Sequence, residues 1–306
     1  MNSRTRGFCA VIVSAVFFGL VPMLARIVCA NGGNMISAAF YRFSLAVIPL
    51  FIYLKYAKIP LGITGKQFWK IVIITVFGYG GTALTLFLSY EYIPSGMATT
   101  IHFVYPVFVI LGSILFLKER ADRVKLLCIT LCMAGILLFY DGHAQGSVLG
   151  ILLAFVSGIT YGFYIIYLDR CGLGDMPTLK LIFYMNIIGA ALLLAGSLGA
   201  GQFTAAMNPA GWGAMLVLSL GTSFGAVCLF QKGVRLVGPQ NASILSTFEP
   251  ITSLLVGSLL FQEHLTIRTF VGCVFILAAV VLVARSKNSG DEAAQKDRPE
   301  CKGQPE

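Results

Sequence analysis

Charged side chains are scarce in this chain of 306 residues. Asp, Glu, Lys and Arg make up 11% of it, against roughly 25% in soluble domains. Apolar residues make up 57%. A soluble protein of this length would need a far more polar surface. The composition therefore excludes a soluble globular domain and predicts an integral membrane protein.

Metal-binding and phosphate-binding motifs are also missing. The eight cysteines include no CxxC pair and no spacing typical of a zinc site. Cys128 and Cys132 lie four residues apart on one helical face and could in principle bind a metal, but small packing side chains are the favoured interpretation. No GxxxxGK[ST] loop exists, since Gly65-Lys66 is followed by Gln67. We therefore expect no metal, no cofactor and no ATP-driven transport by this chain alone.

The net charge of +9 does not predict nucleic-acid binding, because no basic patch is interleaved with aromatic residues on a soluble element. With the N-terminus inside, most of the 22 basic residues fall in cytoplasmic loops. Basic residues near a span resist translocation. This bias predicts a multi-pass protein of the cytoplasmic membrane, bacterial in origin, with both termini cytoplasmic.

Long apolar runs fill the rest of the chain, and each is near the ~20 residues that a bilayer requires. They predict an all-α integral membrane protein with ten transmembrane helices. The predicted spans are residues 8–30, 37–57, 69–90, 97–117, 124–140, 148–168, 179–198, 212–230, 241–261 and 267–284.

The first apolar run has an alternative interpretation as a signal peptide, because Arg4 and Arg6 precede it and 28–30 imitates a cleavage site. The run is too long for a signal peptide, contains Arg26 and has a copy later in the chain, so a membrane span is favoured. Residues 286–306 are polar without apolar periodicity, which predicts a disordered cytoplasmic tail.

The sequence repeats itself in outline at an offset of 143 to 144 residues, which predicts two units, residues 1–143 and 144–285. Each unit holds five predicted spans, and an odd number makes the second unit enter the bilayer from the opposite side. Such inverted repeats are typical of secondary transporters. The matching pairs are Ser14 and Ser157, Gly19 and Gly162, Phe40-Tyr41 and Phe183-Tyr184, Ala98 and Ala242, Pro106 and Pro250, Leu111 and Leu255, Leu115 and Leu259, and Glu119 and Glu263.

The duplicated Ala, Pro and Glu pattern resembles the drug/metabolite transporter superfamily, in particular its ten-span EamA-type members. The pattern ends in Leu-Lys-Glu-Arg at 117–120 and in Phe-Gln-Glu-His at 261–264, a departure that puts any symmetric function of these loops in doubt. The resemblance covers nearly the whole chain apart from the tail. It implies an inverted-repeat carrier of amino acids or other small metabolites, often an exporter. It also implies a central cavity lined mainly by spans one, three, four, six, eight and nine.

Glu249 is the sharpest candidate for a substrate-binding or coupling residue. It lies inside the ninth predicted span, where a carboxylate is costly to keep and often binds an ion or substrate. Protons are a possible coupling ion. The alternative is a glutamate that only bonds to a neighbouring helix. Its repeat counterpart Tyr105 is also polar, and His102 shares a helical face with Tyr105, as a substrate contact or as a packing residue.

Two prolines and two further glutamates recur within the repeat. Pro106 and Pro250 fall at mid-span, where a proline frees a carbonyl and bends the helix. Each could serve gating or form a static kink. Glu119 and Glu263 lie at the span exits, and each precedes another helix whose N-terminus favours an acid. Helix capping is the favoured interpretation of both.

Other polar residues recur on the faces or ends of the spans. Arg26, Arg42 and Glu91 fall near outer span ends, where they could form an ion-paired outer gate or extend to the lipid headgroups. Aromatic and hydroxyl side chains share helical faces in spans three and six, and fit either a small-molecule cavity or helix packing. These cavity candidates are Tyr79, Thr82, Tyr161 and Tyr164.

A secondary carrier of a small-molecule substrate is the function these patterns favour. A membrane-embedded enzyme would need clustered acids, histidines or a metal set, and the ionisable groups within the spans are few and scattered. A non-transporting scaffold or receptor would not need paired mid-span prolines or a buried glutamate, although it could inherit them. Substrate identity, direction, coupling ion and oligomeric state stay open at this point.

Overall fold

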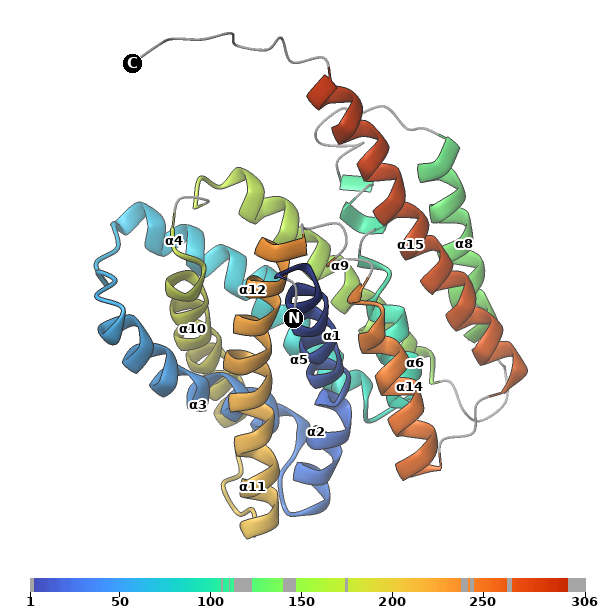
Figure 1. The fold of residues 1–306 in the computed structure, drawn as a ribbon. Helices are drawn as coiled ribbons and strands as arrows, with labels where there is room; N and C mark the ends of the chain where they lie inside the picture. The colour runs from blue at the N-terminus through green and yellow to red at the C-terminus, as the bar shows by residue number, and fades with distance from the viewer. Residues whose placement is uncertain are drawn as a thin grey trace, which may run out of the picture.

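The computed structural model describes residues 3–105, 107–109, 111–112, 123–139, 147–173, 176–237, 242, 245–262 and 266–296. Within these ranges every regular element is a helix (Figure 1). Pro106, Glu119 and Glu263 lie outside the described residues, so the predictions made for them stay predictions.

The first half of the chain supplies eight described helices. Asn34 caps one of them and Thr64 forms a capping box with Gln67 at the start of another. In chain order they are α1 (Ser3–Gly19), α2 (Val21–Ala30), α3 (Met35–Tyr56), α4 (Gly65–Ile74), the π-helix η1 (Thr75–Tyr79), α5 (Gly80–Ser89), α6 (Ser95–His102) and α8 (Arg123–Phe139).

The second half of the chain supplies seven described helices. They are α9 (Val148–Arg170), α10 (Thr178–Gly199), α11 (Pro209–Leu218), the π-helix η2 (Ser219–Ala226), α12 (Val227–Val237), α14 (Phe248–Phe261) and α15 (Ile267–Lys296).

Six helical segments are long and apolar enough to cross a membrane, and they correspond to predicted spans one, two, three, six, seven and eight. Three shorter apolar helices, Leu126–Leu138, Phe248–Phe261 and Ile267–Ala279, fall in predicted spans five, nine and ten. Span four contains α6 and residues outside the described ranges. The all-helical membrane fold is thus confirmed, while the count of ten stays a prediction.

The packing of the helices follows the repeat. α1 packs against α12, and their counterparts α9 and α5 pack against each other. Three further contacts join an element to its own copy: α3 to α10, α6 to α14, and α8 to α15. The α8 and α15 helices lie side by side along one edge of the bundle (Figure 1). Each half therefore completes its packing only against the other.

Both copies of the fourth span are interrupted at the same level. In the first copy, Phe103 and Val104 separate α6 from the helical turn that begins at Tyr105. In the second, Ser246 and Thr247 precede α14. Pro250 has no N–H to donate to the carbonyl of Ser246, and the N–H of Glu249 donates to it instead at 3.0 Å. The expected bend at Pro250 is therefore a local break in the helix.

The third span and its copy, the eighth, each contain a π-helical segment, η1 and η2. An i→i+5 turn inserts a residue into the α-helix and often marks a functional site. Within η1, Thr75 and Gly78 are buried in the core. The apolar pattern of the sequence does not indicate either segment.

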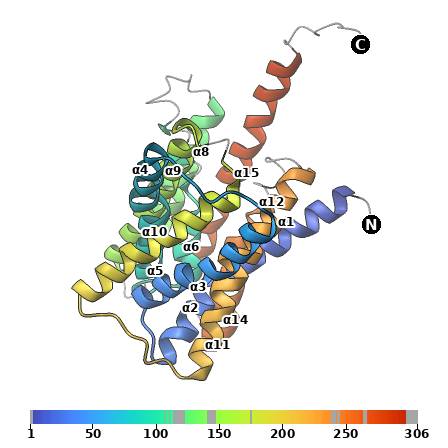
Figure 2. The same cartoon turned by 90° about the vertical axis from the view of Figure 1, so that its left-hand side faces the viewer.

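The tail differs from its prediction over residues 286–296, where α15 continues as a helix to Lys296 and projects beyond the bundle (Figure 2). Ala293, Ala294 and Lys296 are strong helix formers, so a helix that is already nucleated can extend through them. Residues 297–306 lie outside the described ranges.

Candidate functional site

Aromatic side chains from the first repeat and from α9 form a connected cluster between the interrupted span four and span six. The rings of Tyr105 and Tyr161 meet edge to face, with centroids 4.7 Å apart, and His102 lies 5.3 Å from Tyr161. Tyr161 in turn stacks on Tyr164 at 5.4 Å. The three tyrosines are half-buried, so each keeps a part of its surface accessible.

The cluster continues into the π segment of span three. Tyr79, the last residue of η1, lies 6.1 Å from Tyr164 and stacks on Phe43 of α3 at 5.1 Å. Its hydroxyl forms a hydrogen bond with Ser223, which belongs to η2. The two repeat-related π segments thus meet through this bond, at the junction of the two halves.

His102 is held in one orientation by Ser157. Its Nδ1 lies 3.0 Å from the Oγ of Ser157, and the Ser157 hydroxyl donates to the carbonyl of Ala154 at 2.6 Å. Because the hydroxyl has one proton, which Ala154 receives, the Oγ accepts from the N–H of His102. In its neutral form His102 therefore carries its proton on Nδ1 and presents Nε2 as an acceptor.

Glu249 lies in the first turn of α14, immediately after the break in span nine. Its side chain is half-buried and interacts electrostatically with Arg42, Tyr105 and Tyr161. Among the described residues no hydrogen-bond partner of its carboxylate is found. The backbone of α1 fixes its position, because a Cβ on Gly19 would lie 2.6 Å from the Glu249 carbonyl oxygen.

Arg42 supplies a positive charge near Glu249. It lies seven residues inside α3, about 10 Å along the helix axis. Its Nε donates to Ser223 Oγ at 3.4 Å, and its guanidinium lies over the ring of Phe87 at 5.7 Å. The hydroxyl of Ser219 donates to the Arg42 carbonyl at 2.8 Å. Arg42 therefore belongs to the junction of η1 and η2, deeper than its predicted place at an outer span end.

The other two members of the predicted outer gate make different contacts. The guanidinium of Arg26 lies over the ring of Phe261 at 5.0 Å, at the end of α14. Glu91 follows α5 and is exposed. The structure thus places Arg26 within α2 and Glu91 just after α5, and it assigns Arg42 to another set of contacts.

Hydroxyl pairs join the spans around the cluster. The hydroxyls of Thr82 and Thr160 lie 2.8 Å apart and connect α5 to α9. Those of Thr99 and Ser253 lie 3.2 Å apart and connect α6 to α14, and Tyr90 bonds to Thr99. Thr82 therefore serves helix association in this conformation.

Comparison with known proteins bears on the class of this site. The sequence profile of the EamA-like transporter family matches residues 5–141 and again residues 148–285. The chain belongs to the EamA-like transporter family. The two matches, which coincide with the two halves of the bundle, confirm the resemblance to the drug/metabolite transporter superfamily and make this protein a membrane transporter.

Relatives of this EamA-like transporter match it over most of its length. An uncharacterised transporter of Archaeoglobus fulgidus is 29% identical and covers 91% of this chain and 96% of its own. The uncharacterised inner membrane transporter YicL of Salmonella typhimurium is 24% identical over 96% of this chain and 100% of its own. A crystal structure with 15% identity superposes with a TM-score of 0.62, covering 92% of this chain and 97% of that one, which shows a shared fold.

Several residues of this EamA-like transporter's central site escaped the sequence analysis. Ser157 and Gly162 were visible as repeat partners of Ser14 and Gly19, and Ser157 precedes Tyr161 by one helical turn, so a helical face could have indicated it. Ser223 had no such signal, because its contacts with Tyr79 and Arg42 join segments distant in sequence.

Proposed function

We propose that this protein is a secondary-active carrier of small metabolites, amino-acid-like or amphipathic, and that it exports them by alternating access of its two inverted repeats. The substrate binds at the junction where η1, η2 and the two interrupted spans approach one another. Both termini face the cytoplasm, and protons are the proposed coupling ion.

One observation carries this proposal: a carboxylate without a described hydrogen-bond partner shares the junction with a guanidinium and half-buried tyrosines. Keeping Glu249 charged away from water costs free energy unless a cation or a proton compensates it. Arg42 is the nearest described source of compensation, and it is already bonded to Ser223. Glu249 is therefore free to bind a substrate amine or a proton.

The proposed substrate contacts divide by charge. Glu249 receives the amine, and Arg42 supports the opposite, carboxylate end of a zwitterion. Tyr105, Tyr161 and Tyr164 provide aromatic surface with hydroxyl groups at its edge, which suits an amphipathic body. His102 offers Nε2 as a further acceptor.

The interrupted helices give the repeats a way to move. At each break, hydrogen bonds of the helix are replaced by hydrogen bonds of a turn formed by a few residues. Pro250 has no N–H, so the helix cannot continue through the break in the second repeat. The matched breaks permit the half-helices to tilt while α8 and α15, or α3 and α10, stay paired. Pro106 holds the same role in the first repeat.

The test compares uptake into proteoliposomes for the wild type and Glu249→Gln. A thermal-shift screen of amino acids and related metabolites on purified protein first selects the compounds to assay. We expect Glu249→Gln to lose most transport and the pH dependence of what remains. Glu292→Gln, which removes a carboxylate from the projecting end of α15, is the matched control and keeps wild-type transport.

Two outcomes decide against parts of this proposal. If Glu249→Gln transports at the wild-type rate with the wild-type pH dependence, Glu249 takes no part in the mechanism. An absence of transport for every compound that stabilises the wild type would instead favour a binding or receptor role for the same junction.

A further inference from the structure

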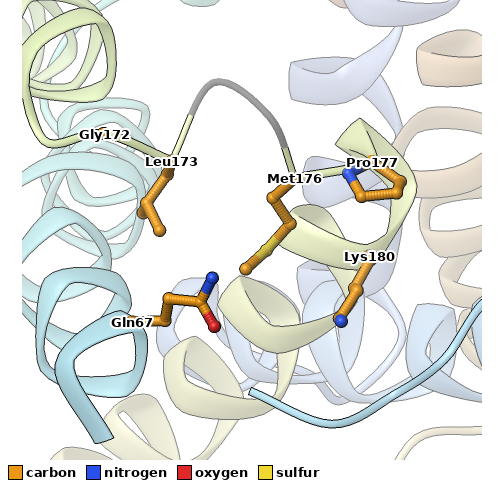
Figure 3. A pocket seen from close by; sticks show the side chains of 6 residues that line it. All are labelled: Gln67, Gly172, Leu173, Met176, Pro177 and Lys180. Carbon is orange, nitrogen blue, oxygen red and sulfur yellow. The ribbon is translucent and has the colours of Figure 1, made fainter. Parts of the chain in front are cut away.

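A separate pocket lies away from the central junction, between the start of α4, the loop after α9 and the start of α10. Its volume is about 230 Å³, room for roughly eight water molecules at ~30 Å³ each. The side chains that line it are shown in Figure 3: Gln67, Gly172, Leu173, Met176, Pro177 and Lys180. None of them belongs to the proposed transport site.

Lys180 supplies a buried positive charge at the wall of this pocket. Its side chain is only 8% exposed, and its Nζ donates to the carbonyl of Gly62 at 2.7 Å. An ammonium group has three protons to donate, so two stay available. No carboxylate of the described residues pairs with it. A buried cation in this condition favours an anionic partner.

Gln67 adds a second donor. Its Oε1 already accepts the N–H of Thr64 at 2.9 Å in the capping box. The Nε2 amide is the part left for another partner, and Figure 3 shows the Gln67 amide facing Leu173 and Met176 across the pocket. Gln67 therefore offers the pocket the two N–H groups of its amide.

Two further features add positive potential. α10 begins beside Pro177, which provides no side-chain cap, so the first N–H groups of a long helix point toward this end with the positive pole of the helix dipole. At the rim, the Nζ of Lys70 lies 3.6 Å from the place a Cβ on Gly172 would take. The two described charged side chains at this pocket, Lys180 and Lys70, are thus both cations.

We propose that this pocket binds a phosphate group carried on a small organic substituent, either the headgroup of an anionic phospholipid or a free phosphate ester. A phosphate oxygen accepts several hydrogen bonds at once, which matches a lysine, an amide and a helix start around one cavity. Under the predicted orientation the pocket faces the cytoplasmic leaflet, where basic pockets between helices bind headgroups.

The surroundings of the pocket favour the lipid source. Phe68 and Trp69 are exposed on α4 beside Gln67, at 42% and 65%, and exposed aromatic residues of this kind mark a membrane interface. Lys66 is exposed on the same helix. Two acids in this region, Asp169 and Asp175, have side chains outside the described part of the structure.

The test measures the melting temperature of the purified full-length protein in detergent while one compound is titrated. Phosphatidylglycerol, phosphatidylethanolamine with the same acyl chains, and glycerol 3-phosphate are the three probes. We expect phosphatidylglycerol to stabilise the wild type, and Lys180→Gln to weaken its apparent affinity about tenfold. Lys70→Gln should weaken it several-fold. Lys232→Gln, an exposed lysine of α12, removes the same charge elsewhere and should leave the affinity unchanged.

The probes also separate the two sources. Stabilisation by phosphatidylglycerol alone identifies a lipid site, and comparable stabilisation by glycerol 3-phosphate identifies a site for free phosphate esters. If Lys180→Gln does not fold, Lys70→Gln is the variant that tests the proposal. The Lys70 ammonium makes no hydrogen bond within the described residues, so its removal should not prevent folding. Equal effects of the two phospholipids, no effect of any probe, or wild-type affinity in Lys70→Gln and Lys180→Gln would overturn the proposal.

Discussion

The tight contact between Gly19 and the backbone of Glu249 makes a quantitative prediction. A Cβ on Gly19 would lie 2.6 Å from the Glu249 carbonyl oxygen and 2.6 Å from Thr252 Cβ. Both distances fall 0.8 Å short of the 3.4 Å at which ordinary contact begins. Because the carbonyl belongs to the backbone of α14, no side-chain rotation relieves the overlap. In Gly19→Ala, α1 and α14 must separate.

The expected cost follows from two opposing effects. Overpacking of a well-packed interface costs about 1–3 kcal/mol, and alanine recovers up to about 1 kcal/mol of helix propensity relative to glycine. The difference is about 0–2 kcal/mol. Because the overlap is with backbone, we expect Gly19→Ala to lower the free energy of unfolding by about 1–2 kcal/mol, the upper part of that range. The shift of α14 also moves Glu249, so transport should fall more than stability alone explains.

The repeat provides a graded comparison. A Cβ on the counterpart Gly162 would lie 2.9 Å from Phe108 Cβ but 3.5 Å from the Tyr105 oxygen, a milder overlap. Gly196 has no atom within 4 Å of a new Cβ and is exposed on α10. We expect the free energy of unfolding to decrease in the order Gly196→Ala, wild type, Gly162→Ala, Gly19→Ala.

The assay is reversible unfolding in mixed micelles as a denaturing detergent is titrated, with transport of the same preparations measured in proteoliposomes. Equal unfolding midpoints for Gly19→Ala and Gly196→Ala would refute the reasoning, because the interface would then accommodate a methyl group that the geometry excludes.

Three further predictions concern polar groups other than Glu249. Asn186 is fully buried in α10, and neither of its amide atoms has a hydrogen-bond partner in the described part of the chain. Asn186→Leu should therefore raise the unfolding free energy by about 1–3 kcal/mol, measured by the same titration. Ser157→Ala removes the hydroxyl that accepts from the Nδ1 of His102 and should cost about 1–3 kcal/mol, whereas a cost within error would show that the bond contributes nothing. A double-mutant cycle of Thr99→Val and Ser253→Ala should give a coupling energy of about 0.6 kcal/mol, and strict additivity would contradict a direct bond.

The candidate site illustrates which residues a linear pattern can indicate. Glu249 and Tyr105 were identifiable because an ionisable or polar residue deep in an apolar run stands out against its neighbours. Tyr161 and Tyr164 shared a helical face, and the structure brings both onto the cluster with Tyr105. Whether these residues contact substrate stays a prediction that the transport assays test.

Arg42 shows where the pattern fails. Its place in the sequence indicated an outer span end, but its partners are Ser223, 181 positions away, and Phe87. A side chain as long as arginine can reach toward the headgroups or into the bundle, and only the packing of α3 against η2 selects between these directions.

The linear chain is enough to identify a helical membrane protein built from two related halves, because apolar length and an internal repeat can both be seen without a structure. The tertiary structure decided where the halves meet. It joined η1 to η2 through the bond between Tyr79 and Ser223, it placed Gly19 against Glu249, and it turned a predicted bend at Pro250 into a break. The physical reason is that these features depend on the close approach of backbones from different spans. The packing energy of such contacts depends on residues from both halves, so the sequence of one half does not predict them.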